Sequence, residues 1–174
     1  MSSTKGIALL PDAGPLITLA YADALDVLSK PGWTVMLVDM VLHEVTRNPT
    51  PTSTKLAEWA ASARIPVLPT KTYKHFKKTA TENAAAKKNN LGELAIQEAM
   101  NQFALMAPPK IGVFLFEDHK IARASFLVPD NCRKISTRAF LIFLEQKGLI
   151  ESAAAIERQA IQVGRVFSTL RFPL

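Results

Sequence analysis

Four carboxylates stand at the edges of apolar segments that are far apart in the chain, and together they could bind a divalent metal. The segments are Ile7-Ala-Leu-Leu-Pro-Asp12, Val41-Leu-His-Glu44, Leu91-Gly-Glu93 and Val113-Phe-Leu-Phe-Glu-Asp118. A parallel sheet brings such edges to one end, where unbalanced negative charges repel one another strongly. Mg²⁺ and Mn²⁺ prefer carboxylate, water and phosphate oxygens. The spacing therefore indicates metal-assisted attack of water on a phosphodiester.

Each carboxylate also has a local explanation. Asp12 precedes a helix and is a good N-cap, and Asp118 can cap a helix in the same way. Glu93 lies in the first turn of a helix, where the helix dipole favours an acid. Glu44 can form a weak surface pair with Arg47, three residues further on. These explanations remain open for each acid singly, but they do not explain why acids recur at two strand ends and two helical sites.

Other kinds of chemistry lack their motifs. The chain has no Gly-x-Ser-x-Gly elbow, no Walker loop and no Gly-x-Gly-x-x-Gly fingerprint. Its one cysteine, Cys132, has no histidine nearby in sequence and cannot form an intramolecular disulfide. The three histidines, His43, His75 and His119, do not have the spacing of zinc ligands. A metal-bound water therefore replaces a covalent nucleophile in our interpretation.

Short apolar runs alternate with helical patterns along the chain. Runs without polar alternation are typical of strands buried on both faces of a parallel sheet, and they occupy residues 6–10, 34–38, 65–68 and 112–116. Helical periodicity covers residues 16–28, 40–46, 54–63, 91–105, 137–146 and 151–163, with Gly148 as a stop between the last two. This order predicts an α/β sandwich with a mainly parallel sheet.

The bulk composition is that of a globular chain. It has 174 residues, of which 48% are hydrophobic and 21% charged, so we expect one domain over residues 1–174, with a core of 6–163 and a tail of 164–174. No secretory pattern or membrane span is evident, and we expect a complete, cytoplasmic chain. The net charge of +6 favours a polyanionic partner, with a merely soluble basic protein as the alternative.

A lysine-rich segment lies just before Glu93 in the sequence. Residues 71–90 contain an Ala-Ala-Ala stretch that favours a helix, one acid, Glu82, and the lysines Lys71, Lys74, Lys77, Lys78, Lys87 and Lys88. We interpret these lysines as contacts for a nucleic-acid backbone beside the metal site. The alternative is a solvated helix face.

The chain resembles PIN-domain ribonucleases, particularly VapC-like toxins and their relatives. The matching segments are Asp12-Ala-Gly-Pro-Leu-Ile, Val41-Leu-His-Glu44-Val, Leu91-Gly-Glu93-Leu-Ala-Ile, Phe114-Leu-Phe-Glu-Asp118-His-Lys-Ile-Ala-Arg, Ile135-Ser-Thr-Arg-Ala-Phe-Leu and Lys147-Gly-Leu-Ile. The resemblance covers about residues 6–163. Each segment is short, and the order and spacing of the acids are more specific than any one of them.

The resemblance implies a three-layer α/β/α sandwich that cleaves RNA with Mg²⁺ or Mn²⁺. The residues that it implies as metal ligands and catalytic groups are Asp12, Glu44, Glu93 and Asp118, with Glu117 as an extra ligand or a supporting group. Two residues depart from the family pattern. Gly14 stands where many relatives have Ser or Asn, and Phe116 stands where Thr or Ser commonly precedes the last acid. A hydroxyl missing at position 116 would weaken support of the metal site.

Three functions follow from these observations. The leading hypothesis is a metal-dependent endoribonuclease, the toxin of a toxin–antitoxin pair, with RNA, an antitoxin and a second copy of the chain as partners. The second is a catalytically weak or inactive PIN-like module that binds nucleic acid or protein, and Phe116 favours it. The third, a phosphotransfer or receiver-like domain, ranks low because Asp12-Ala-Gly lacks the second acid of an Asp-x-Asp loop.

Overall fold

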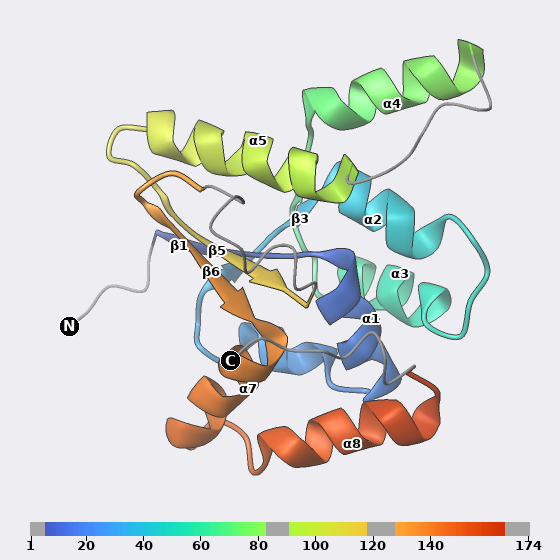
Figure 1. The fold of residues 1–174 in the computed structure, drawn as a ribbon, viewed down its shortest axis with the longest axis vertical. Coiled ribbons are helices and arrows are strands. Elements are labelled where there is room, and N and C mark those ends of the chain that lie inside the picture. The colour runs from blue at the N-terminus through green and yellow to red at the C-terminus, as the bar shows by residue number, and fades with distance from the viewer. Residues whose placement is uncertain (1–5, 83–90, 118–127, 166–174) are drawn as a thin grey trace.

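Four parallel strands form the centre of the computed structural model, which describes residues 6–82, 91–117 and 128–165 (Figure 1). Their order across the sheet is β2 (Thr34–Val35), β1 (Ile7–Pro11), β5 (Ile111–Phe116) and β6 (Cys132–Ser136). A second parallel pair joins β3 (Leu37–Val38) to β4 (Val67–Leu68). The predicted α/β class and mainly parallel sheet are confirmed.

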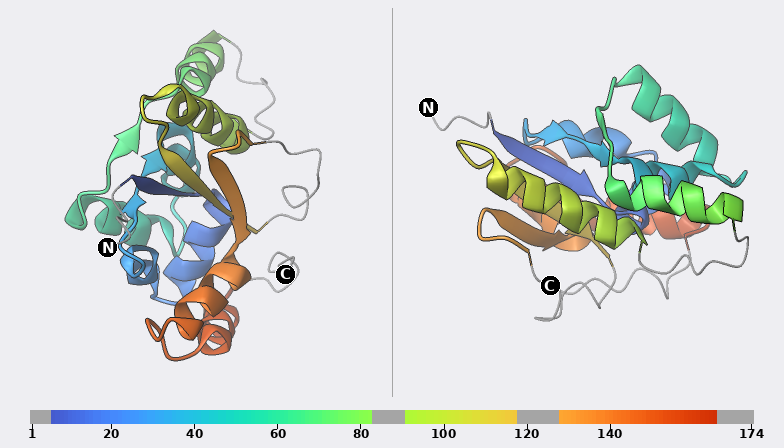
Figure 2. Two further views of the ribbon diagram at one scale, coloured as in Figure 1. Left: turned by 90° about the vertical axis from the view of Figure 1, so that its left-hand side faces the viewer. Right: turned by 90° about the horizontal axis from the view of Figure 1, so that it is seen from above.

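Helices cover both faces of this sheet. In Figures 1 and 2, α5 and α4 lie on one side of the strands, and α7 and α8 lie on the other. The helix bounds are α1 (Ala13–Tyr21), α2 (Asp39–Thr46), α3 (Ser53–Ser62), α4 (Lys71–Glu82), α5 (Leu91–Leu105), α7 (Thr137–Gln146) and α8 (Ala153–Val163). Since α2 packs against both α1 and α5, it joins the two helical layers near the carboxyl ends of the strands. The arrangement is consistent with the three-layer α/β/α sandwich.

Two predicted elements are divided by local geometry. The helix expected over residues 16–28 is α1 followed by a short 3₁₀ helix, η1 (Leu25–Ser29), because Asp23 has a φ of 53° and reverses the chain between them. The strand expected over residues 34–38 changes partner within its length. Met36 N donates to Leu9 O at 3.0 Å, whereas Leu37 N donates to Pro66 O at 3.0 Å. One extended segment therefore serves both sheets.

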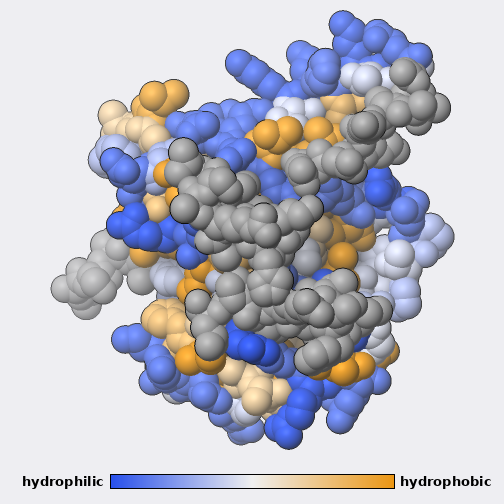
Figure 3. Space-filling model, in the orientation of Figure 1, coloured by the Kyte–Doolittle hydropathy of each residue, from blue (hydrophilic) through white to orange (hydrophobic). Residues whose placement is uncertain are grey.

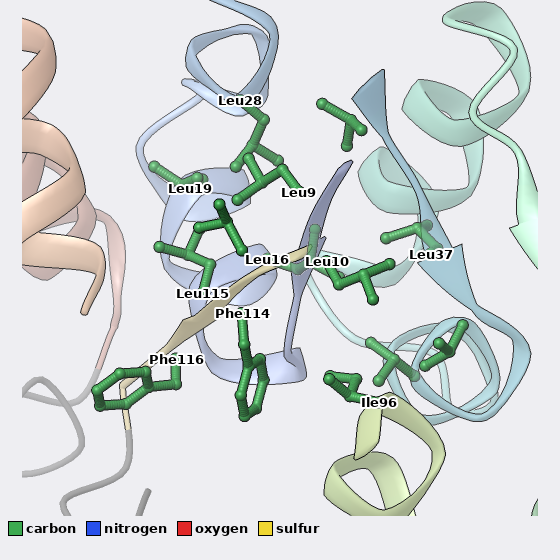
Figure 4. Close-up of a cluster of buried hydrophobic side chains, with 14 of the residues drawn as sticks. Leu9, Leu10, Leu16, Leu19, Leu28, Leu37, Ile96, Phe114, Leu115 and Phe116 are labelled. Carbon is green, nitrogen blue, oxygen red and sulfur yellow. The ribbon is translucent and has the colours of Figure 1, made fainter. Parts of the chain in front are cut away.

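The core uses both faces of the central strands. Leu9 and Leu10 are 0% and 1% exposed although they point to opposite faces, as expected for a strand buried on both sides. Figure 4 shows Leu9 and Leu115 pointing toward α1 and η1, and Phe114 pointing toward the side that carries Ile96 of α5. With the exception of Ala160, the buried hydrophobic side chains of the described residues form one cluster.

The helices of the described ranges are too short or too polar to cross a membrane. The longest α-helix of the described ranges, α5, has 15 residues and carries acids at both Glu93 and Glu98. A bilayer span requires about 20 predominantly apolar residues.

Candidate metal and nucleic-acid site

Asp12 lies at the carboxyl end of β1 and begins α1. Its N–H continues the ladder by donating to Leu115 O at 2.9 Å, and its Oδ1 accepts the Ala13 N–H at 2.8 Å. The predicted N-cap role is therefore confirmed. Asp12 is only 8% exposed, and its position at the ligand-binding edge of a parallel sheet is the one expected for a functional acid. The two roles are compatible because a helix N-terminus stabilises a carboxylate.

Glu44 reaches the same point from α2. Its carboxylate accepts a hydrogen bond from the Gly92 N–H at the start of α5. A Cβ atom at Gly92 would lie 2.9 Å from Glu44 Oε2, 3.3 Å from Oε1 and 3.4 Å from Asp12 Oδ1. A side chain at position 92 would therefore displace the Glu44 carboxylate from this close approach. Asp12, Glu44 and the start of α5 meet here, as the spacing of the acids predicts.

The electrostatic environment of Glu44 disfavours its charge. The pKa of Glu44 is raised to about 7, mainly by burial and also by the negative charge of Glu93, although the Gly92 N–H and Arg47 act to lower it. Arg47 has the smallest of these four effects, so a surface pair does not describe the environment of Glu44. Two acids that repel each other in a half-buried site favour a cation between them.

Glu117 directly follows β5 and is 4% exposed. Its Oε2 accepts the Thr18 hydroxyl at 2.9 Å and an Arg165 guanidinium N–H at 3.2 Å, and Arg165 Nε donates to Thr18 Oγ1 at 3.0 Å. Burial raises the pKa of Glu117, and the Thr18 hydrogen bond and the Arg165 charge oppose that rise. These bonds favour the predicted supporting role over that of a direct metal ligand.

Both departures from the family pattern lie against this network. A Cβ at Gly14 would lie 3.3 Å from both Cβ and Oε2 of Glu117, so a larger residue would crowd the buried carboxylate. Phe116 is itself buried, and its carbonyl oxygen is 3.5 Å from the Thr137 hydroxyl. Hydroxyls near this strand end therefore come from Thr18 and Thr137 on the flanking helices.

The predicted lysine surface lies on α4, which packs against α2 and α5. Lys71, Lys74, Lys77 and Lys78 are exposed there. Lys77 Nζ lies 4.9 Å from the centre of the Tyr73 ring, and Tyr73 Oη is 3.4 Å from Nδ1 of His43, the residue before Glu44. These contacts connect the lysine helix to the helix that carries Glu44. Lys87 and Lys88 lie outside the described residues.

Sequence reasoning did not identify Gly92, Thr18 or Arg165. A glycine directly before a first-turn acid was the only signal for Gly92, since a glycine inside a helix is unfavourable unless something approaches closely. Thr18 and Arg165 carry no local signal, because they are 147 residues apart and meet only in the fold.

The metal prediction fits the chemistry of the donors. Asp12 and Glu44 direct hard carboxylate oxygens toward one point, as Mg²⁺ and Mn²⁺ require, and Glu93 adds negative charge. In the described ranges no group of three or more His, Cys, Asp or Glu side chains has the geometry to hold a metal ion. Asp118, the fourth predicted ligand, directly follows Glu117 and lies outside those ranges.

Comparison with known proteins adds no family to these observations. No protein-family model, no curated protein and no solved structure matches the chain. The case for its function therefore rests on its own residues.

Proposed function

We propose that this protein is a PIN-like, metal-dependent endoribonuclease that hydrolyses RNA phosphodiester bonds, and that it acts as the toxin of a toxin–antitoxin pair in the cytoplasm. One observation carries the proposal. Carboxylates from β1 and α2 converge on the glycine that begins α5, and the acid that follows this glycine raises the pKa of Glu44. Such crowding is unfavourable without a cation, and it occurs at the sheet edge where α/β proteins bind ligands.

In this proposal Asp12, Glu44, Glu93 and Asp118 are the four ligands, and Asp118 completes a site that the three described acids do not form by themselves. A bound Mg²⁺ or Mn²⁺ supplies a hydroxide-like water and charge stabilisation at the phosphate. Asp12 is oriented for this role by its bond to the Ala13 N–H. Glu44 is oriented by the Gly92 N–H, and it must lose its proton when a cation binds.

RNA is the substrate class that suits the surrounding charge. The exposed lysines of α4 provide salt-dependent contacts to phosphates without reading sequence. The Arg165–Glu117–Thr18 network supports the strand end from which the chain continues to Asp118. A support of this kind would orient Asp118 without itself touching the substrate.

A toxin role requires a partner that inhibits it, and it allows a second copy of the chain. Exposed apolar side chains near the amino end of β5 are suitable for such contacts. Leu105 is 86% exposed, and Met106 and Ile111 are 50% and 47% exposed. These residues are separate from the carboxylates, which lie at the opposite end of the strands.

The second candidate is an inactive PIN-like module that binds RNA or protein. The observation that favours it is Phe116, because a buried phenyl ring occupies the position before Glu117 and offers no hydroxyl there. This candidate keeps the lysine surface and predicts RNA binding without hydrolysis.

Cleavage of a labelled RNA distinguishes the two candidates. We would compare the wild type with Asp12→Asn and Glu93→Gln in Mg²⁺ or Mn²⁺ and in EDTA. Glu58→Gln is the matched control, because Glu58 is an exposed acid on α3. The nuclease predicts metal-dependent cleavage that falls at least ~100-fold in both site variants and is unchanged in the control. Binding without cleavage by the wild type would favour the inactive module.

A further inference from the structure

A pocket of about 490 Å³ lies between α4 and α5, beside the candidate metal site. Its walls are mainly apolar, and they include His75, Phe76 and Thr79 of α4 and Leu91 and Leu94 of α5. Figure 3 shows hydrophobic surface where these two helices meet. Leu94 is 49% exposed although it is a large apolar residue within an ordered helix. This surface is therefore suited to a ligand with an apolar face.

The pocket is continuous in sequence with the carboxylates. Leu91 precedes Gly92, whose N–H bonds Glu44, and Leu94 follows Glu93. The pocket wall and the candidate metal site are therefore formed by adjacent residues of α5. A ligand in the pocket could place a second group, joined to the first, at the carboxylates. A nucleotide has this form, because its flat apolar base is joined to a phosphate.

The charges around the pocket match a polyanion. Lys71 contributes to the pocket wall, and Lys74 and Lys78 are exposed on the same helix. Among the described residues of the wall, the one acid is Glu98. Its carboxylate already accepts two backbone N–H groups and a hydroxyl at 2.7–3.0 Å from Lys71 and Thr72. Glu98 therefore joins α5 to α4 and leaves the lysines to bind phosphate.

We propose that this pocket receives one unstacked nucleobase of single-stranded RNA while the adjoining phosphate lies at the carboxylates. The proposal rests on the proposed function and specifies its substrate. Bases of a double helix are stacked inside it, so only a single strand, loop or end can insert one. The His75 ring and the Leu91 and Leu94 side chains would contact the base face without reading its edge. RNA is favoured over an apolar protein helix because the surrounding helix is rich in lysine.

Binding of a fluorescent ten-nucleotide single-stranded RNA tests this proposal. The measurement is made in EDTA, so that its result does not depend on cleavage. We expect Leu94→Ser to weaken binding about tenfold, because contact with a base contributes strongly to single-strand affinity. The matched control is Val163→Ser on α8, which is 51% exposed and outside the pocket, and the affinity of this variant should stay within about twofold of the wild type.

Abasic RNAs identify the group that enters the pocket. Removing one base at the contacted position should weaken binding to the wild type about tenfold and have no further effect on Leu94→Ser. Equal affinity of the wild type and Leu94→Ser for the intact RNA would overturn the proposal. The proposal would also be overturned if Leu94→Ser lost binding to a protein partner while its RNA affinity stayed equal to that of the wild type. If Leu94→Ser bound RNA about tenfold more weakly but the wild type did not cleave RNA, the proposed nuclease activity would be refuted and the proposed nucleobase pocket would stand.

Discussion

Glu98 and Glu44 lie on neighbouring helices, but their carboxylates have opposite surroundings. Glu98 accepts hydrogen bonds from Lys71 N, Thr72 N and Thr72 Oγ1, and it fixes the start of α4. Such bonds between a carboxylate and backbone N–H groups hold the first turn of a helix in place. Its surroundings are those of a structural acid, which needs no further ligand.

Glu44 has much less compensation. One backbone N–H, from Gly92, and the weak effect of Arg47 oppose burial and the charge of Glu93. The comparison shows that Glu98 stabilises the fold, whereas the charge of Glu44 lowers the free energy of unfolding. Acids of the second kind are candidates for function, because a cation can supply what the protein does not.

Glu117 shows a third solution, in which the protein supplies the cation itself. Arg165 and Thr18 bind one oxygen of this buried carboxylate, whereas Oε1 has no hydrogen-bond partner within the described part of the chain. The three glutamates therefore differ in which groups compensate the negative charge. Each difference gives a measurable consequence.

The largest expected effect is that of removing the cation beside Glu117. Arg165→Met should lower the free energy of unfolding by about 3 kcal/mol, because it leaves a buried carboxylate without its partner. For a chain of this length the corresponding fall in Tm is roughly 6–12 °C. Thermal and urea unfolding measure it.

The double variant Arg165→Met/Glu117→Gln is the control for this prediction. It removes the unpaired charge together with its partner, so it should recover part of the lost stability. A fall below about 1 kcal/mol in the single variant would show that the pair is no more than a surface interaction.

The sequence predicted elements best where packing and periodicity agree. Leu91–Leu105 and Thr137–Gln146 have the bounds that their apolar spacing indicated. β6 was missed by the search for apolar runs, because it is an edge strand with an exposed Arg133 and a half-buried Lys134. The resemblance indicated its end alone, from Ile135. An edge strand buries fewer of its side chains and therefore gives a weaker signal.

The convergence of Asp12 and Glu44 was predictable from the sequence, whereas the groups that compensate the charges of the acids were not. Asp12 and Glu44 were identified because they follow or interrupt apolar segments in an α/β order. Thr18 and Arg165 could not be identified in this way, since only the fold brings α1 and the residues after α8 together. Which acids are compensated is a tertiary property, and that property separates Glu44 from Glu98.

The second prediction concerns metal affinity and pH. A metal binds the ionised carboxylate, and burial together with Glu93 raises the pKa of Glu44 to about 7. At pH 6 most Glu44 side chains are protonated, so Mn²⁺ should bind about tenfold more weakly than at pH 8. Isothermal titration at the two pH values measures the ratio.

Glu98→Gln is the control, because Glu98 is not in the metal site. It should keep the tenfold ratio, whereas Glu44→Gln should bind weakly at both pH values. An affinity that does not change between pH 6 and pH 8 in the wild type would contradict a role for Glu44 as a ligand.

The third prediction is that the same substitution has opposite effects on stability at the two glutamates. At pH 8 without metal, Glu44→Gln should raise the free energy of unfolding by about 1 kcal/mol, after allowance for its partial exposure. Glu98→Gln should lower it by about 1 kcal/mol, because charge-assisted bonds to α4 are weakened. Urea unfolding measures both.

The pH dependence of stability determines the sign of the effect of Glu44→Gln on the free energy of unfolding. The folded pKa of Glu44 lies above the value of 4.5 for an unperturbed glutamate, so ionisation destabilises the fold as pH rises from 4.5 to about 7. The advantage of Glu44→Gln should therefore disappear below pH 4.5. A destabilising Glu44→Gln at pH 8 would mean that the acid contributes to the fold as Glu98 does.

The smallest expected effect tests whether Glu117 is held rigidly. Alanine is favoured over glycine in a helix by about 1 kcal/mol, and Gly14 lies in the first turn of α1. Its new Cβ would lie 3.3 Å from Glu117, which Arg165 and Thr18 hold in place. Gly14→Ala should therefore change stability by less than about 0.5 kcal/mol, because crowding offsets the helical gain.

The helical gain of Gly14→Ala and its crowding against Glu117 can be measured separately when Glu117 is shortened. In a Glu117→Ala background, Gly14→Ala should stabilise the protein by about 0.5 kcal/mol relative to that background, since the contact with Oε2 is gone and only the contact with the Cβ of residue 117 remains. The comparison is made by urea unfolding of the four proteins. Equal effects of Gly14→Ala in the two backgrounds would mean that the Glu117 carboxylate moves aside freely. A carboxylate that moves freely could not support the end of β5, whereas the coupling expected here would identify Glu117 as the rigid counterpart of the uncompensated Glu44.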